Sequence, residues 1–254
     1  MRRNTAKQKL AAGQPITVVA PGYPSPGLVE AVAHLGFDAI FLDGEHGSAS
    51  WEDTENMIRA AELAGATPIC RVQANDAAII TRTLDRGAGG VQVPHVNTAD
   101  EARLAVRYAK YGPIGERGWA GGRAALGVPA GEYAAHANDE TMVVVMLEEV
   151  QALKNLEAIL AVEHIDVFFV APGDLAQSMG HTGQAEHPEV VAAVDGAVDR
   201  VHAAGRVAGV LTTPATVGKY LDKGVLYLYV SLAHLLQPGA RGFLQTVAAA
   251  GGKK

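Results

Sequence analysis

Short apolar runs alternate with longer amphipathic stretches along most of this chain. The runs are rich in Val, Ile and Leu and roughly four to eight residues long, which is typical of strands buried on both faces of a parallel sheet. They occupy residues 16–20, 39–44, 67–72, 90–96, 143–149, 165–172, 207–211 and 226–232. Because a helical pattern follows each run, we expect an α/β fold with eight strand–helix units, a (β/α)8 TIM barrel. An open doubly wound sheet is the alternative, but the chain carries no nucleotide-binding fingerprint that would favour it.

The ends of several predicted helices are marked by capping residues. Ser50 with Asp53, and Thr98 with Glu101, have the spacing of a capping box, and glycines stand where helices should end. Residues 1–14 are expected to form a polar lead-in of one or two helical turns to a single barrel domain that covers residues 1–254. The longest irregular segment, 112–140, is rich in glycine, and we interpret it as a mobile flap.

Composition and charge limit the partners and the cellular compartment that are expected for this protein. The formal net charge of −6 leaves no basic face, so nucleic acid is not an expected partner. Cys70 is the only cysteine, which excludes an intrachain disulfide and favours a reducing compartment. No apolar run approaches the roughly 18 residues that a membrane helix needs. We therefore expect a cytoplasmic protein that does not enter a membrane.

Charged residues gather where the predicted strands end. The run at 39–44 stops at Asp43, Glu45 and His46, and the next run ends at Arg71. Glu148 and Glu149 close the fifth run, and Asp174 follows the sixth. The carboxyl ends of barrel strands share one mouth, where active sites form, so these side chains should meet. A solvated loop with incidental charge is the alternative for the segment 43–46.

Two of these acids have the chemistry of a metal site. Glu148 and Asp174 are hard oxygen ligands from adjacent strands, which suits Mg²⁺, Mn²⁺ or Co²⁺ with open positions for substrate. Alternatively, Glu148 or Glu149 only begins the next helix, where an acid favours the helix dipole.

Arg71 and His46 are the candidates for binding and proton transfer. The planar guanidinium of Arg71 can hold a carboxylate or an oxyanion, although it can equally be a structural partner of Glu45 or Asp43. An unperturbed histidine changes its charge near neutral pH, so His46 is the best acid/base candidate. The other histidines near predicted loops are interpreted as loop or rim residues: His95, His181, His187 and His234.

Several motifs together resemble the HpcH/HpaI aldolase family, the class II pyruvate-dependent aldolases of the 4-hydroxy-2-oxoheptanedioate type. They are LDGEH, R-V-x-x-N-D, LDRGAGGVQVPHVNTADEA, P-x-G-E-R-G, a glutamate after an apolar strand, and V-A-P-G-D-L-x-x-S-M-G. They occur in family order, and the similarity extends from about residue 16 to 245. The resemblance implies a divalent-metal-dependent carbon–carbon lyase that acts on a 2-oxo acid and an aldehyde.

The resemblance also implies roles for individual residues. Glu148 and Asp174 would bind the metal, while Arg71, Gly173 and Asp174 would contact the substrate. His46 would be the acid/base residue, with Asp85 as its partner across a subunit contact. The resemblance further implies a homohexamer, a dimer of trimers, in which the C-terminal helix is exchanged and packs onto a neighbouring chain. This chain departs from many members at Met146, where they carry glutamine, and in having Ala-Pro-Gly-Asp at 171–174 where they usually carry Gly-Pro-Ala-Asp.

The resulting expectation is an aldolase that cleaves 4-hydroxy-2-oxo acids to pyruvate, or a close analogue, and an aldehyde through a metal-bound enolate. A Schiff-base aldolase would need a lysine inside the barrel, and no predicted strand carries one. Two alternatives remain: an acyl-CoA lyase of the citrate-lyase-like branch, and a catalytically silent barrel that serves as a binding subunit.

Overall fold

The computed structural model describes residues 3–251 and shows a closed barrel of eight parallel strands in the order β1 to β8. β1 pairs with both β2 and β8, which closes the ring. The strands are β1 Ile16–Ala20, β2 Ala39–Asp43, β3 Thr67–Arg71, β4 Gly90–Val93, β5 Met142–Leu147, β6 Val167–Val170, β7 Ala208–Leu211 and β8 Tyr227–Ser231. The TIM-barrel prediction is confirmed.

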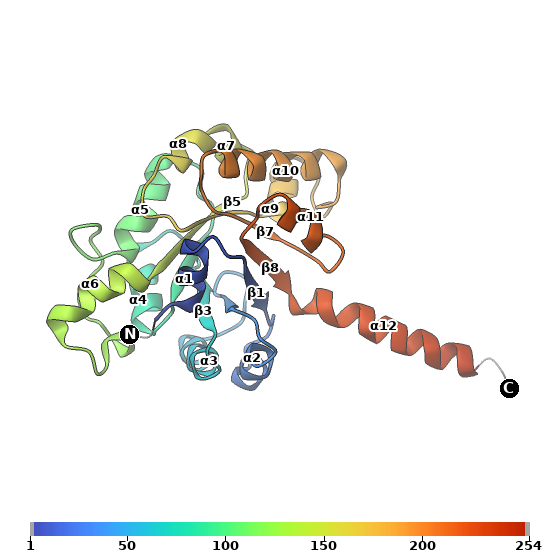
Figure 1. Cartoon of the computed structure of the whole chain (residues 1–254), viewed down its shortest axis with the longest axis horizontal. Helices are drawn as coiled ribbons and strands as arrows, with labels where there is room; N and C mark the ends of the chain where they lie inside the picture. The colour runs from blue at the N-terminus through green and yellow to red at the C-terminus, as the bar shows by residue number, and fades with distance from the viewer. Residues whose placement is uncertain (1–2, 252–254) are drawn as a thin grey trace.

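Helices surround the barrel on its outer side (Figure 1). The α-helices are α1 Thr5–Ala11, α2 Pro26–Ala33, α3 Trp51–Leu63, α4 Ala77–Asp85, α5 Ala99–Ala109, α6 Ala130–Glu140, α7 Val150–Lys154, α8 Leu156–Leu160, α9 Pro172–Ser178, α10 Pro188–Ala203, α11 Val217–Asp222 and α12 Leu232–Gly251. A short 3₁₀ helix, η1, spans Arg123–Ala125. Both predicted capping boxes are present, at the starts of α3 and α5.

Two apolar layers hold the fold together. The larger layer fills the space between the strands and the surrounding helices, whereas the smaller one fills the barrel interior. In the interior, Phe169 meets Tyr227 and Tyr229 edge to face. Met146 is buried in this interior layer, so an apolar side chain occupies the position where the family resemblance leads one to expect glutamine. Ala6 and Leu10 of α1 are also buried there, so the N-terminal helix packs against the interior layer rather than standing apart.

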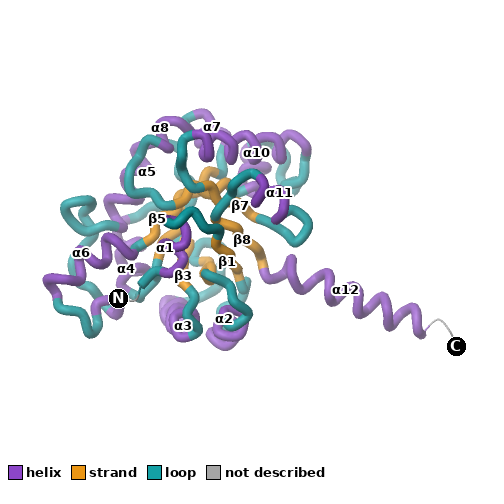
Figure 2. The backbone as a smooth tube through the Cα atoms, in the orientation of Figure 1, coloured by secondary structure: helices purple, strands orange, loops and turns teal. Residues whose placement is uncertain are grey.

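Several predicted boundaries differ from those of the structure. The expected strand 165–172 ends at Val170, and α9 begins at Pro172 because proline is well suited to the first position of a helix. The helix expected around Leu153 to Leu160 is two short helices, α7 and α8, which meet at Asn155. The strands predicted at 90–96 and 143–149 end earlier, at Val93 and Leu147, so Glu148 and Glu149 lie in the connection that follows β5 (Figure 2).

The glycine-rich segment after α5 packs against α3 and α4 through two arginines. Arg117 is buried, forms an ion pair with Asp85 at 2.7 Å and lies over the Tyr111 ring. Arg123 pairs with Glu62. This segment joins a helix to the following strand, so in its own chain it lies at the face opposite the barrel mouth.

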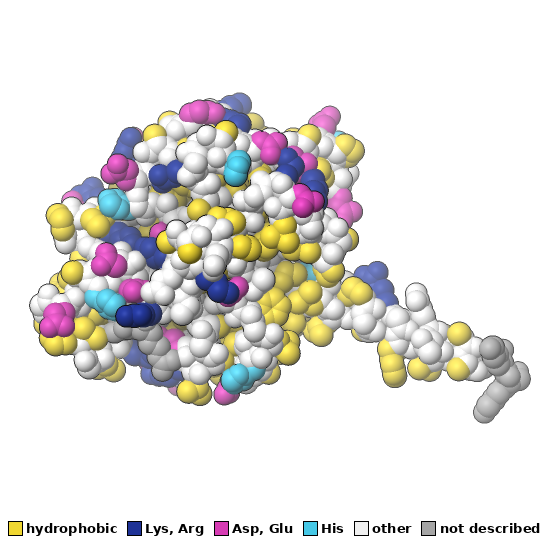
Figure 3. Space-filling model, viewed as in Figure 1, with side chains coloured by type: hydrophobic (Ala, Val, Ile, Leu, Met, Phe, Trp, Pro, Cys, Tyr) yellow, Lys and Arg dark blue, Asp and Glu magenta, His cyan; other side chains and the backbone are white. Residues whose placement is uncertain are grey.

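The last helix, α12, extends away from the barrel (Figure 1). Hydrophobic side chains are exposed along it (Figure 3), and those of Leu236, Phe243 and Leu244 are more than half exposed, at 61%, 70% and 64%. No helix within residues 3–251 is long and apolar enough to cross a membrane.

Candidate active site

Arg71, at the end of β3, binds two acids from the end of β2 and the loop that follows it. Asp43 is the last residue of β2 and Arg71 the last of β3, and the two are directly paired in the sheet register. The guanidinium donates to both Asp43 carboxylate oxygens, at 2.9 and 2.7 Å, and a third nitrogen lies 3.0 Å from Glu45. Three of the five N–H donors of arginine are used in this way. The structural pairing and the predicted binding role are therefore compatible, since two donors remain.

Asp43 also shapes the loop that carries the next functional side chains. Its carboxylate accepts the backbone N–H groups of Glu45 and His46, at 3.0 and 3.2 Å. Gly44 passes close to β3: a Cβ there would lie 2.6 Å from the backbone oxygen of Arg71. Any larger residue would displace the loop, so glycine between the two acids is a packing requirement.

The charge state of this cluster follows from its contacts. Burial raises the pKa of the Asp43 carboxyl, but the hydrogen bonds and charge of Arg71 outweigh it and hold the pKa below its ordinary value. Burial lowers the pKa of Arg71, but the hydrogen bonds and charge of Asp43 and the charge of Glu45 outweigh it and raise the pKa. The ion pair is therefore fully charged at neutral pH.

Glu148 is a buried carboxylate at the end of β5, with a relative exposure of 1%. It accepts the backbone N–H of His95 at 2.6 Å. Burial raises the pKa of its carboxyl to about 7; the His95 N–H opposes this shift, while the charges of Asp174 and Glu45 add to it. The helix-start alternative describes Glu149, which stands at the N-cap position of α7 although its side chain makes no capping hydrogen bond, but not the buried Glu148.

His95 lies within this cluster of acids, which the sequence interpretation missed. Its Nδ1 is 2.9 Å from Glu149 and 3.5 Å from Glu148, while its Nε2 is 3.3 Å from Glu45. Partial burial lowers the pKa of His95, but the three carboxylates outweigh it and raise the pKa. His95 follows the carboxyl end of β4, so the rule that selected Asp43 and Arg71 selects it as well.

Asp174 and Gly173 lie in the first turn of α9, after β6. Asp174 is close enough for its charge to raise the pKa of the Glu148 carboxyl. A buried carboxylate beside a second one is unfavourable without a cation, and oxygen ligands of this kind fit Mg²⁺, Mn²⁺ or Co²⁺. Gly173 is exposed, and N–H groups in a first helical turn have no partner within the helix.

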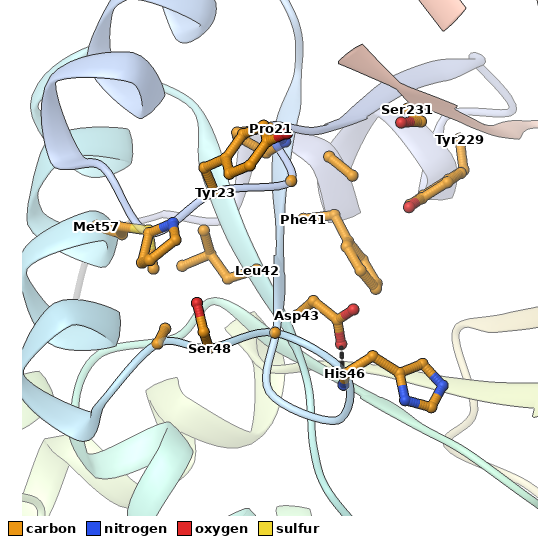
Figure 4. A pocket seen from close by; sticks show the side chains of 15 residues that line it. Pro21, Tyr23, Phe41, Leu42, Asp43, His46, Ser48, Met57, Tyr229 and Ser231 are labelled. Carbon is orange, nitrogen blue, oxygen red and sulfur yellow. Dashed lines mark hydrogen bonds between the residues drawn. The ribbon is translucent and has the colours of Figure 1, made fainter. Parts of the chain in front are cut away.

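A cavity of about 170 Å³ lies beside Asp43 and His46, between β1, β2 and β8, and neither Glu148 nor Asp174 is among the residues that line it (Figure 4). It is lined by Tyr23 and Met57 at one side and by Tyr229 and Ser231 of β8 at the other, none of which the sequence interpretation selected. The His46 side chain is 68% exposed, with Nε2 3.9 Å from Glu45.

Asp85 is not brought to His46 within the chain. It is the last residue of α4 and pairs with Arg117 on the opposite face of the barrel. A contact between Asp85 and His46 therefore needs a second chain.

Comparison with known proteins agrees with this geometry. Residues 21–230 match the family model HpcH/HpaI aldolase/citrate lyase. A hydroxypyruvate/pyruvate aldolase of Cupriavidus necator is 38% identical over 240 residues, which cover 93% of this chain and 89% of the relative. A 4-hydroxy-2-oxo-heptane-1,7-dioate aldolase of Klebsiella pneumoniae is 37% identical over 241 residues, covering 93% and 91%.

The same fold has been solved in a family protein from Burkholderia cenocepacia. That structure superimposes with a TM-score of 0.90 at 32% identity and covers 96% of this chain and 99% of its own. The chain belongs to the HpcH/HpaI aldolase/citrate lyase family and is a class II aldolase, a carbon–carbon lyase.

Proposed function

We propose that this pyruvate-type aldolase cleaves 4-hydroxy-2-oxo acids to pyruvate, or a close analogue, and an aldehyde, with a divalent metal ion bound by Glu148 and Asp174. The observation that carries the proposal is the buried Glu148 carboxylate with the charge of Asp174 beside it. The relatives named as hydroxypyruvate/pyruvate aldolase and heptanedioate aldolase support this substrate class.

The metal would be Mg²⁺, Mn²⁺ or Co²⁺, because the proposed ligands are carboxylate oxygens. When bound, such an ion supplies a Lewis acid that polarises the keto oxygen of the substrate. The buried position of Glu148 and the N–H of His95 fix the orientation of its carboxylate, so this ligand is held before any ion arrives.

Cleavage needs a base at the C4 hydroxyl and a stabiliser at the C2 oxygen. His46 is the proposed base: it takes the hydroxyl proton, the C4 carbonyl forms, and the C3–C4 bond breaks with its electron pair moving toward C2. The two N–H donors that Arg71 does not use for Asp43 and Glu45 stabilise the negative charge that develops on the C2 oxygen. Proton return to C3 completes pyruvate.

The aldehyde would occupy the cavity beside His46. Apolar side chains of Phe41 and Met57 line it together with hydroxyl groups of Tyr23, Tyr229 and Ser231. Since His46 reaches both this cavity and solvent, it is suited to move a proton between substrate and water.

We also propose that the working site is shared between chains of a homohexamer, a dimer of trimers. Asp85 would reach His46 of another chain, because within its own chain it lies on the opposite face. The projecting α12 supports an assembly, because its exposed Leu236, Phe243 and Leu244 would be buried against a second copy.

A cleavage assay tests the proposed reaction. Full-length protein is stripped with a chelator and given Mg²⁺, Mn²⁺ or Co²⁺, and pyruvate release is followed over a panel of 4-hydroxy-2-oxo acids. We expect release only with metal, and none from Glu148→Gln. Glu157→Gln is the matched control, since Glu157 pairs with Arg200 on the surface. Undiminished release by the stripped protein in excess chelator would exclude the proposed metal role.

A further inference from the structure

A second cluster of metal-binding side chains lies where the connection after α9 meets the first turn of α10 (Figure 1). His181 and His187 belong to the connection, and Glu189 to α10. Each offers one ligand atom, and these atoms all lie within 4.8 Å of one another. His181 Nε2 is 3.0 Å from a Glu189 carboxylate oxygen. The two imidazole rings stack with centroids 3.7 Å apart and an interplanar angle of 17°.

Backbone contacts place the two histidines on the same side of this connection. The His181 N–H donates to the Ala176 carbonyl at 2.7 Å, which ties it to α9. The His187 N–H donates to the Gln184 carbonyl at 2.9 Å, and Gln184 in turn donates to the His181 carbonyl at 2.9 Å. The turn also uses Gly183 at φ +76°, a conformation that glycine adopts without strain. The approach of the rings therefore follows from a folded turn.

We propose that His181, His187 and Glu189 form a binding site for a borderline transition-metal ion such as Zn²⁺, separate from the carboxylate pair at the barrel mouth. Two imidazole nitrogens and one carboxylate oxygen are a common ligand set for zinc, and a fourth position stays open for water. Mg²⁺ prefers oxygen ligands and would not compete well here.

The distances suit such an ion. With zinc bonds of about 2.0 Å in tetrahedral geometry, ligand atoms stand about 3.3 Å apart. His181 Nε2 and the Glu189 oxygen are 3.0 Å apart, and all ligand atoms are within 4.8 Å of one another. Because Glu189 is exposed and both histidines are half-buried, side-chain rotation can close the remaining gap.

Binding the ion would replace the proton shared by His181 Nε2 and the Glu189 carboxylate, and it would open the parallel stack of the two rings, because imidazole lone pairs lie in the ring plane. A further contact would also be lost. The Glu189 N–H donates to His187 Nδ1 at 3.3 Å, which caps α10. A metal bound to Nδ1 replaces this donor directly. A metal bound to Nε2 moves the ring proton to Nδ1, which removes the acceptor. In either case water can take the freed N–H, and the long distance shows that the displaced bond is weak.

Cobalt spectroscopy tests the site in full-length protein. After chelator treatment, Mg²⁺ is kept in excess and Co²⁺ is added, because four-coordinate Co²⁺ with nitrogen ligands absorbs visible light much more strongly than octahedral Co²⁺. We expect one strongly absorbing Co²⁺ per chain, displaced by Zn²⁺. The band should persist in a Glu148→Gln/Asp174→Asn background, where the mouth carboxylates are removed. Loss of the band in that background would assign it to the barrel mouth and overturn the proposal.

Variants of the proposed ligand residues provide a second test of the site. Loss of an outer-shell partner alone costs roughly 10- to 100-fold in metal affinity, so His181→Gln or Glu189→Gln should weaken Zn²⁺ binding by at least that much. His34→Gln, which alters an exposed histidine at the end of α2, is the control and should bind as wild type. Thermal unfolding in chelator, compared with wild type, checks that each variant is folded. Equal Zn²⁺ affinity in wild type and His181→Gln would overturn the proposal, as would absence of Zn²⁺ binding by wild type.

Discussion

Replacing Arg71 should damage both stability and catalysis, by amounts that follow from its three ionic contacts. Arg71→Met leaves Asp43 and Glu45, whose side chains are only 29% and 12% exposed, without their cationic partner. Breaking a buried ion pair costs about 3 to 5 kcal/mol, and the partial exposure of Asp43 places the expected loss at the lower limit, roughly 3 kcal/mol. For a chain of this length each kcal/mol lowers the melting temperature by about 2 to 4 °C. We therefore expect a decrease of roughly 6 to 12 °C.

The variant Arg71→Lys separates the effect of the positive charge from the effect of the planar guanidinium group. An ammonium keeps the charge but cannot bridge both Asp43 oxygens and Glu45, so a smaller stability loss is expected, together with a rate loss of about 10²- to 10³-fold for a missing oxyanion donor. Calorimetry gives the stability, and exchange of the pyruvate C3 protons in D₂O gives the enolate chemistry. Arg107→Lys is the matched control, since Arg107 pairs with Glu116 on the surface and should change neither. Wild-type exchange by Arg71→Lys would refute the assigned role.

Three further outcomes are expected. Burial, with the charge of Lys7, lowers the pKa of Lys110 from 10.5 to about 7. Between these pH values the unfolded chain therefore binds more protons than the folded chain. The free energy of unfolding should consequently rise with pH, by up to about 1.4 kcal/mol per pH unit. Urea titrations at several pH values measure this rise, which should be smaller in Lys110→Met. Inactive His46→Ala and Asp85→Ala chains, refolded together, should regain some activity if the site is shared; no recovery in demonstrably mixed oligomers would contradict this. Phe243→Asp should reduce the oligomer mass by light scattering, and an unchanged mass would contradict the role of α12.

Most of the fold could be predicted because the buried strands have a distinct sequence pattern. Runs such as Val143–Leu147 are buried on both faces, so they are continuously apolar and end where the barrel meets solvent. The errors arose where an apolar run continues into a helix. Residues 165–172 were interpreted as one strand, although Pro172 begins a helix, since apolar periodicity alone does not separate a buried strand from a buried helical turn.

Part of the candidate site could be predicted because several of its residues stand directly at the ends of recognisable strands. Asp43 and Arg71 are strand ends, and sheet register brings them together. His95 was set aside as a lone histidine because its acidic neighbours are distant in sequence: Glu148 lies 53 residues away. The side chains that line the cavity beside His46 come from three separate strand ends and their loops, so only the closed barrel shows that Tyr23 and Tyr229 share one space.

Metal-dependent proton exchange at pyruvate C3 tests the central claim most directly, because it reports enolate formation without depending on the aldehyde. Chelator-treated wild type in D₂O should exchange the C3 protons no faster than buffer without enzyme, and added Mg²⁺ or Mn²⁺ should restore the exchange. Glu148→Gln and Asp174→Asn should show no exchange of the C3 protons with either ion, although both variants should fold like wild type. Exchange by the stripped enzyme, or by Glu148→Gln at the wild-type rate, would contradict an active site built on these two carboxylates.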